Sequence, residues 1–262
     1  MIQDIDFSKY KRFFAFGCSF TGYIWPTWAD VLSHEMPNAK FYNMGVSGAG
    51  NLMISARITE ANLKFKFNED DLVIVLWSTF CREDRYFHGM WSTPGNIFTQ
   101  QTYNEAFVKK FCDPKGYLIR DLTIMTMATE YLKSLPCDNI RLMSVPYNYQ
   151  NENDSSVIPI IQSFSDLTSS TPPSMLDLEL QGVFENGHTY FHKSMNQEFG
   201  DYHPNPLRYR GYLEKLKFPL TEISNIFATK STKILKSCRT DSEIKSKFAN
   251  NTNGNYIFNQ WW

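Results

Sequence analysis

Ser19, Asp201 and His203 are the residues whose types and spacing could perform a reaction together. A serine hydroxyl is a weak nucleophile near neutral pH, so acyl transfer requires a base that removes its proton and an acid that orients the base. Asp201 and His203 are the closest Asp/His pair in the chain. In an extended segment, residues two apart point to the same side, so the carboxylate can reach one imidazole nitrogen while the other faces outward. The alternative is a turn in which both side chains bond only to local backbone groups.

The apolar run of residues 13–16 places Ser19 in the expected fold. An unbroken apolar run suits a strand that is buried on both faces of a parallel sheet, and Gly17 and Gly22 allow the tight backbone that ends it. Ser19 is then expected at the carboxyl edge of the sheet. Open α/β sheets bind their ligands at this edge, in a crevice between loops.

Apolar runs and helical patterns alternate along the rest of the chain. This alternation predicts an α/β fold with right-handed crossovers and a mostly parallel sheet. Trp25 and Trp28 share the helix face that should pack on the sheet, and His34 is expected at the surface. The further strands are predicted over residues 39–44, 71–77 and 139–145, and the helices over residues 25–36, 51–65, 118–135 and 207–217.

The length of 262 residues suits one domain, residues 1–262, that carries insertions. Clean periodicity is lost over residues 86–117, which therefore read as an insertion near the site. Residues 146–200 are rich in Asn, Ser, Thr and Pro, and we expect loops with short helices there. A C-terminal extension is expected over residues 225–262.

Charge and cysteine usage limit the class of protein. The formal net charge is −1, so we expect no nucleic acid and no membrane as partner. The five cysteines include no CxxC pair, which argues against a disulfide framework or a thiolate zinc site. The amino terminus carries acids where a signal peptide carries basic residues, which predicts a cytoplasmic protein; a virion-associated protein would have the same signature.

Two other patterns could indicate a cofactor or a metal. The loop of residues 45–50 has glycines in an order that differs from the dinucleotide fingerprint. His188 and His192 have a spacing that could bind zinc on a helix, but Gly187 and the neighbouring aromatic residues weaken a helix there and no third ligand is evident. We therefore expect no cofactor and no metal.

Three short blocks resemble those of the SGNH (GDSL-type) hydrolase family. Residues 17–20, Gly-Cys-Ser-Phe, are similar to the first block of the family, residues 43–48 to its glycine block, and residues 201–204 to its last block. Their order along the chain also matches, with the nucleophile first and the Asp and His together near the carboxyl end. The resemblance implies a flavodoxin-like three-layer α/β/α sandwich with loop-rich insertions.

The same resemblance implies a serine esterase mechanism without a cofactor. His203 would take the proton from Ser19, and Asp201 would orient and stabilise His203. The backbone N–H groups of Ser19 and Gly48 would bind the oxyanion, together with a side-chain donor after the third strand.

The blocks depart from the family pattern at the nucleophile and at the acid. Cys18 replaces the usual Asp beside Ser19, which should be tolerated because this side chain does not react. Asp201 and His203 are one residue closer than in the common form, so Glu198 is an alternative acid.

The third departure concerns the oxyanion hole. The side-chain donor of the family is an Asn, but residues 77–80 read Trp-Ser-Thr-Phe. Thr79 or Ser78 could donate through a hydroxyl, and Asn51 could reach in from the glycine loop. The loss of one such donor raises the barrier by about 2.7–4 kcal/mol, so low activity is one consequence of this change.

The leading hypothesis is a serine esterase that removes small acyl groups, such as acetyl, from a carbohydrate. The partner expected on this hypothesis is a small-molecule or glycan ester substrate. Trp91 and Tyr103 could stack on a pyranose ring, although both could equally be core residues. Arg82 and Arg85 could bind an acidic sugar or pair with the two acids between them. The alternatives are a sugar O-acyltransferase that uses the same residues, and a catalytically weak protein that binds glycans or has a structural role.

Overall fold

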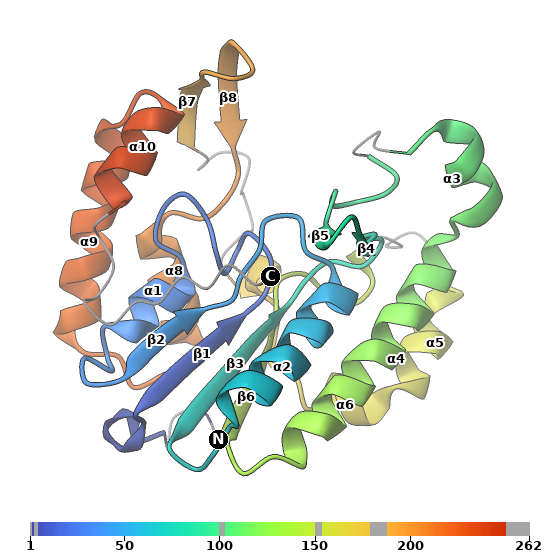
Figure 1. The fold of residues 1–262 in the computed structure, drawn as a ribbon, viewed down its shortest axis with the longest axis horizontal. Coiled ribbons are helices and arrows are strands. Elements are labelled where there is room, and N and C mark those ends of the chain that lie inside the picture. Colours follow the sequence, from blue (N-terminus) through green and yellow to red (C-terminus); the bar gives the residue numbers. More distant parts are fainter. Residues whose placement is uncertain (1, 3–4, 100–102, 150–153, 179–187, 250–262) are drawn as a thin grey trace.

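The chain forms a parallel sheet between two layers of helices (Figure 1). The structure is a computed structural model that describes residues 2, 5–99, 103–149, 154–178 and 188–249, so the last part of the expected C-terminal extension lies outside it. Within these residues the central sheet has four strands in the order β2-β1-β3-β6. All are parallel, so their carboxyl ends meet at one edge. The strands are β1 (Arg12–Phe16), β2 (Lys40–Asn43), β3 (Asp71–Trp77) and β6 (Asp138–Met143).

Helices and two short hairpins complete the described part of the chain. The hairpins are β4 (Arg85–Phe87) with β5 (Met90–Ser92), and β7 (His188–His192) with β8 (Gln197–Asp201). No helix in this part is long and apolar enough to cross a membrane. The helices are α1 (Trp28–Ser33), α2 (Asn51–Phe65), α3 (Glu105–Phe111), α4 (Pro114–Lys133), α5 (Val157–Ser163), α6 (Ser165–Ser169), α7 (Met175–Leu178), α8 (Pro206–Lys215), α9 (Glu222–Ser237) and α10 (Asp241–Phe248).

The two faces of β1 belong to different cores because successive side chains of a strand point to opposite sides. Phe14 and Phe16 pack in the core shared with α2 and α4. Phe13 and Ala15 pack in the core shared with α1, α8 and α9. Two helical layers therefore enclose the sheet, and the prediction of a three-layer α/β fold is confirmed.

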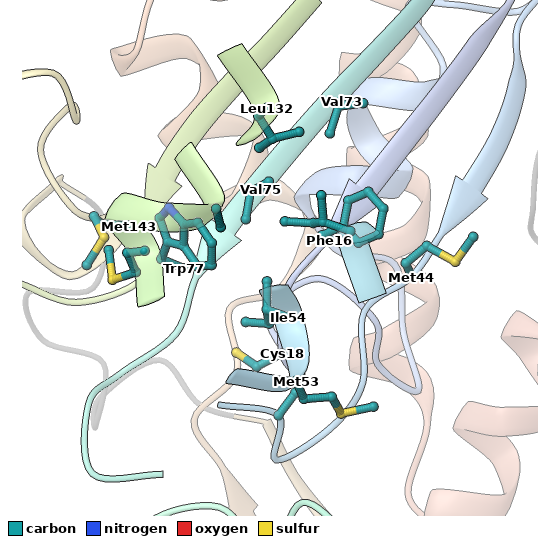
Figure 2. Close-up of a cluster of buried hydrophobic side chains, with 14 of the residues drawn as sticks. Phe16, Cys18, Met44, Met53, Ile54, Val73, Val75, Trp77, Leu132 and Met143 are labelled. Atoms are coloured by element: carbon teal, nitrogen blue, oxygen red, sulfur yellow. The ribbon is translucent and has the colours of Figure 1, made fainter. Parts of the chain in front are cut away.

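The core under α2 and α4 anchors the segment that carries Ser19. Figure 2 shows Val75 and Trp77 of β3 in this core, with Cys18 beside Ile54. Cys18 is 1% exposed, so its side chain fills the core next to the turn rather than the site above it. A small apolar side chain suits this position, because burial of an unpaired Asp would be costly.

The predicted strands and most predicted helices are present, but the first helix is shorter than expected. The helix over residues 51–65 is confirmed as α2. Helix α1 begins at Trp28, because Thr27 caps it with a hydroxyl that accepts from Ala29 N–H. Trp25 therefore precedes the helix and does not share its sheet-facing side. His34 is also more enclosed than expected, since its ring stacks on Phe227 at a centroid distance of 3.7 Å.

The sequence predicted neither the two hairpins nor helix α3, which lies within the region expected as an insertion. The strands of the hairpins are three to five residues long, and in β7 only Tyr190 is fully buried, so they lack a strong period-two pattern. His188 and His192 lie on the strand β7, not on a helix, which corrects the geometry assumed for zinc binding. The β7–β8 hairpin is fixed to the C-terminal helices, because Phe191 N–H donates to Arg239 O at 2.8 Å.

The loops that follow β1 and β2 approach each other at two glycines. A Cβ atom on Gly45 would lie 2.3 Å from Gly22 N, and one on Gly22 would lie 2.5 Å from Gly45 O. Asn43 bridges the same loops, since its amide donates to Thr21 O at 2.7 Å and its oxygen accepts from Gly45 N–H at 3.0 Å. The two loops are thereby held together at the carboxyl edge of the sheet.

Replacement of Gly45 by Ala should destabilise the fold. The added methyl group must push apart two backbone segments, and overpacking of this kind costs about 1–3 kcal/mol. The free energy of unfolding in urea measures the effect. Gly116→Ala is the matched control, because a Cβ there would meet its nearest neighbour, Asp113 Cβ, at an ordinary 3.7 Å, so this variant should be neutral or slightly more stable. Equal stability of Gly45→Ala and wild type would show that the loops can separate freely.

Candidate active site

Ser19, His203 and Asp201 lie together at the carboxyl edge of the sheet. Ser19 follows β1, and its Oγ lies 2.7 Å from His203 Nε2 although the two residues are 184 positions apart. On the other side of the ring, His203 Nδ1 lies 2.6 Å from Asp201 Oδ1. Ser19 is 7% exposed and the His203 side chain 22% exposed, so the reactive groups are partly open to solvent. This arrangement can pass a proton from the hydroxyl to the imidazole.

The short spacing between Asp201 and His203 is accommodated by one carboxylate oxygen. Asp201 ends β8, and its Oδ1 accepts from both the backbone N–H and the Nδ1 of His203, at 3.0 and 2.6 Å. Asp side chains commonly bond to the backbone two residues later, so the turn and the ring share this acceptor. Glu198 lies exposed on the same strand. Asp201 is therefore the carboxylate that contacts the imidazole.

Asp201 is buried and remains an anion. Burial is the largest influence and raises the pKa of its carboxyl group, but the hydrogen bond and charge of His203 and the hydrogen bond from Tyr23 together bring the pKa below its usual value. Its Oδ2 accepts from the hydroxyls of Tyr23 and Tyr190. Neither tyrosine was predicted from the sequence. Tyr23 belongs to no motif, and Tyr190 reaches the site through a hairpin that was not predicted.

Aromatic rings enclose the imidazole of His203. Tyr23 stacks on it with ring centroids 3.9 Å apart and planes 17° apart. Phe20 and Trp25 present their edges at 5.1 and 6.2 Å. Trp25 was expected to pack on the sheet; instead it packs with Tyr190 in a third core and donates from Nε1 to Pro204 O at 3.0 Å. The tryptophan therefore supports the segment that carries His203.

The glycine loop after β2 is held in place from two sides. Gly48 has a φ of +81°, a left-handed conformation that favours glycine, and a Cβ on it would lie 2.2 Å from Thr93 O. At the end of the loop, where α2 begins, the carboxylate of Asp84 accepts from Gly50 N–H at 2.8 Å and Met53 N–H at 2.9 Å. Arg82 Nη1 donates to Ala49 O at 3.0 Å. The segment after β3 thus fixes the start of α2 and the loop before it.

Asn51 and Ser78 are bonded within the protein and do not face the space where a substrate would bind. Both are fully buried, and Asn51 Oδ1 accepts from Ser78 N–H at 2.9 Å. The amide of Asn51 donates to Asp121 Oδ2 at 3.1 Å, which leaves it directed into the protein. Gly50, not Asn51, is the cap of α2. Thr79 is half-buried at the end of β3, and its hydroxyl donates to Phe80 O at 3.3 Å.

Arg82, Arg85, Trp91 and Tyr103, the basic and aromatic residues that the sequence suggested as substrate contacts, all have partners within the protein. Arg82 is tied to Ala49, as described above, and Arg85 pairs with Glu83 at 3.0 Å. The ring of Trp91 is partly buried against the core, and Tyr86 meets it edge-on at 5.8 Å. Tyr103 stacks on Phe107 at 5.2 Å instead of standing free.

A pocket of about 470 Å³ lies between the loop after β1, the glycine loop and α10. Tyr23, Trp25 and Ser47 line it, together with Phe248 of α10. Ser19 and His203 are not among the described residues that line this pocket, so it adjoins the site without containing the Ser19 hydroxyl. Nowhere in the described ranges do three His, Cys, Asp or Glu side chains gather as a metal ion would require.

Removal of the Asp84 side chain should loosen the glycine loop. Asp84→Ala leaves the buried N–H groups of Gly50 and Met53 without acceptors, which costs about 1–3 kcal/mol. Amide hydrogen exchange over residues 45–53 should accelerate, and the free energy of unfolding should fall. Asp70→Asn is the control, because Asp70 pairs with Lys11 at the surface, where a lost pair costs about 1 kcal/mol or less. Unchanged exchange in Asp84→Ala would show that the loop keeps its shape without the carboxylate.

Comparison with known proteins gives only distant matches. No family model matches the chain, and no curated protein does. A member of the lipolytic protein G-D-S-L family from Veillonella parvula is similar in structure, with a TM-score of 0.45 and 12% identity over 80% of this chain and 99% of that one. A protein described as lipolytic, of the same family, from Desulfitobacterium hafniense has a TM-score of 0.41 and 14% identity over 82% and 99% of the two chains. A protein described as a platelet activating factor from Streptococcus pneumonia has values of 0.38 and 15% over 82% and 86%. Similarity of this size establishes neither family nor activity, so the functional assignment depends on the geometry of the site.

Proposed function

We propose that this protein is a serine esterase with Ser19 as nucleophile, His203 as general base and Asp201 as the acid that orients the base. The observation that carries the proposal is the chain of hydrogen bonds from Ser19 Oγ through the imidazole to Asp201 Oδ1. Such a chain places the hydroxyl proton within reach of Nε2, while the carboxylate holds the Nδ1 proton and stabilises the imidazolium that forms. Partial exposure of His203 leaves room for an ester and for water.

The reaction proceeds in two steps. Ser19 Oγ attacks the ester carbonyl as its proton passes to His203, and the imidazolium then protonates the departing alcohol to leave an acyl-serine. Water, deprotonated by the same imidazole, attacks the acyl-serine; the bond from the acyl carbon to Oγ breaks, the imidazolium returns the proton to Ser19 Oγ, and the acid is released. The residues of the chain itself perform every proton transfer.

The oxyanion of each step is assigned to the N–H groups of Ser19 and Gly48 and to the hydroxyl of Thr79. Gly48 is proposed because its loop is held at two points. Thr93 O packs against Gly48, and the Asp84 carboxylate accepts from Gly50 N–H, so the backbone of the loop has little freedom. Thr79 is a weaker donor than the amide of an Asn, because its hydroxyl proton is shared with Phe80 O. A modest turnover is therefore expected, since one good donor lowers the barrier by about 2.7–4 kcal/mol.

Hydrolysis of p-nitrophenyl acetate tests the proposal. Ser19→Ala removes the nucleophile, so the rate should fall at least about a thousandfold, to the residual level that binding alone supports. Ser194→Ala, on the exposed turn of the β7–β8 hairpin, is the control and should retain full activity. A serine-directed phosphonate should label wild type at Ser19, as mapped by mass spectrometry. Equal rates of Ser19→Ala and wild type would remove the enzyme proposal.

For the substrate we propose a carbohydrate that carries a small acyl group such as acetyl. The supporting observation is that the hairpin with Trp91 continues directly into Thr93, whose Oγ1 donates to Ser47 O at 3.1 Å and whose carbonyl covers Gly48. A partly exposed indole thus lies two residues before Thr93, the residue that contacts the glycine loop. Ring faces of this kind pack on the apolar face of a pyranose.

Trp91→Ala should separate the sugar part of the substrate from its ester. The variant should raise KM for an acetylated oligosaccharide about tenfold, because about 1–1.5 kcal/mol of ring contact is lost. The rate with p-nitrophenyl acetate should stay within twofold of wild type, since this ester has no sugar to stack. Tyr149→Ala, which removes an exposed ring elsewhere, is the control for sugar hydrolysis. An unchanged KM for the sugar ester would exclude Trp91 as a sugar contact.

The same residues could transfer the acyl group to a sugar hydroxyl instead of to water. The two reactions differ only in the acceptor that attacks the acyl-serine. Product analysis with acetyl donor and oligosaccharide acceptor distinguishes them, because a transferase forms the acetylated acceptor in preference to acetate. A protein that binds glycans without turnover would form neither product but would still bind to a glycan array.

A further inference from the structure

The two oxygens of the Asp201 carboxylate have different partners. Oδ1 accepts from the backbone N–H and from the ring of His203. Oδ2 accepts from the hydroxyls of Tyr23 and Tyr190, the latter at 3.1 Å. The Asp201 side chain is 1% exposed, so these protein donors take the place of water.

Tyr23 contacts both members of the Asp–His pair with one rigid side chain. Its hydroxyl bonds to Asp201, and its ring covers the face of the imidazole at 3.9 Å with an angle of 17° between planes. Tilt of the His203 ring is therefore opposed by Tyr23 on its face and by Phe20 and Trp25 at its edges.

The two tyrosines come from elements that are far apart in the sequence. Tyr23 follows Ser19 by four residues in the loop after β1, and Tyr190 lies on β7, the strand paired with β8. The carboxylate of Asp201 joins them. The loop that carries the hydroxyl of Ser19 is thus hydrogen-bonded to the hairpin that carries the acid, apart from the Ser19–His203 contact itself.

We propose that Tyr23 and Tyr190 are positioning residues that fix the Asp201 carboxylate through Oδ2 and moderate its pull on the Nδ1 proton of His203. This inference rests on the proposed esterase function for its effect on rate. Hydrogen bonds to a carboxylate spread its charge and make it a weaker acceptor for its remaining partner. Without them, Oδ1 binds the Nδ1 proton more strongly and stabilises the imidazolium more than the neutral ring.

The charged and titratable groups around this cluster permit that role. Burial first, and the Asp201 charge second, raise the pKa of Tyr23 and Tyr190, so both phenols remain donors near neutral pH. Tyr209 and His188 also interact electrostatically with Asp201, and Asp241 interacts with Tyr190. Burial raises the pKa of Tyr209 and lowers that of His188, so both are neutral at pH 7. The hydroxyls of Tyr23 and Tyr190 differ from these groups because they bond directly to the carboxylate.

Tyr23→Phe and Tyr190→Phe remove one hydroxyl each and keep the rings. Each should lower kcat for p-nitrophenyl acetate about tenfold, the effect of one lost bond to a charged group, with KM within twofold. The acidic limb of the kcat/KM profile should move to higher pH by roughly half a unit or more. Tyr10→Phe is the matched control, because it too loses a hydrogen bond to a carboxylate, from Tyr10 to Asp138 at 2.8 Å, at the opposite end of the sheet. Tyr10→Phe should leave kcat and the pH profile unchanged.

A second measurement does not depend on turnover. In the Ser19→Ala protein, the downfield proton resonance of His203 Nδ1–H should move farther downfield when either tyrosine is replaced by Phe, because the carboxylate becomes a stronger acceptor. Tyr190 matters here because it bonds to Asp201 without covering the imidazole, so its variant isolates the carboxylate effect if Tyr23→Phe folds poorly. Circular dichroism and thermal unfolding report the folding of each variant.

The outcomes distinguish this inference from the proposed function. If wild type and Ser19→Ala hydrolyse the ester equally, the esterase proposal fails, whereas a shifted resonance still supports the tyrosines as positioning residues. If Ser19→Ala is inactive and neither tyrosine variant moves the resonance or the acidic limb, the positioning role is overturned and the tyrosines only fill space.

Discussion

The hydrogen bond between Ser19 Oγ and His203 Nε2 joins segments 184 positions apart, and much of the fold holds one or the other of its ends. The serine end is rigid. β1 is paired on both sides, and the turn after it is closed by Thr21 N–H and Gly22 N–H, which donate to Cys18 O at 2.9 and 3.0 Å. With Cys18 fixed in the core, the hydroxyl that follows it has little freedom.

The histidine end is built on elements outside the central sheet. The β7–β8 hairpin that leads to Asp201 and His203 stands apart from the parallel strands (Figure 1) and is supported by the C-terminal helices. Lys193 N–H donates to Asp241 Oδ1 at 3.2 Å, and Tyr190 packs with Leu235 and Ile244. The region of α9 and α10, expected as an extension, is thus part of the support for the acid and the base. Tyr23 connects this peripheral hairpin to the loop that carries Ser19, through a side-chain hydrogen bond to Asp201 rather than through a sheet.

The sequence was informative where the physical signal is strong and local. Buried parallel strands give continuous apolar runs, so β3 was predicted at its observed bounds and Ser19 at the correct edge. Asp201 and His203 were found because an extended segment places alternate side chains together. Trp25 was misplaced because Thr27 starts the helix later than the aromatic spacing suggested, and a cap competes with periodicity in setting a helix start. Tyr23 and Tyr190 carry no motif, and their meeting depends on a hairpin with one fully buried residue in β7.

Two buried carboxylates near the site show how the number and kind of donors decide the state of an acid. Burial is the largest influence on both Asp84 and Asp201 and raises the pKa of each. Asp84 has two backbone donors and only distant guanidinium groups, so burial prevails and its pKa is raised. Asp201 accepts from the imidazole and backbone N–H of His203 and from Tyr23, and these bonds together with the charge of His203 outweigh burial and lower its pKa. An acid that clamps a loop can be protonated and still accept a hydrogen bond, whereas an acid that stabilises an imidazolium must be charged when the base is charged. The donors around Asp201 favour the charged form that the second requirement needs, whereas burial opposes the charged form of Asp84. These donors, rather than nearness to Ser19 alone, distinguish Asp201 as the partner of His203.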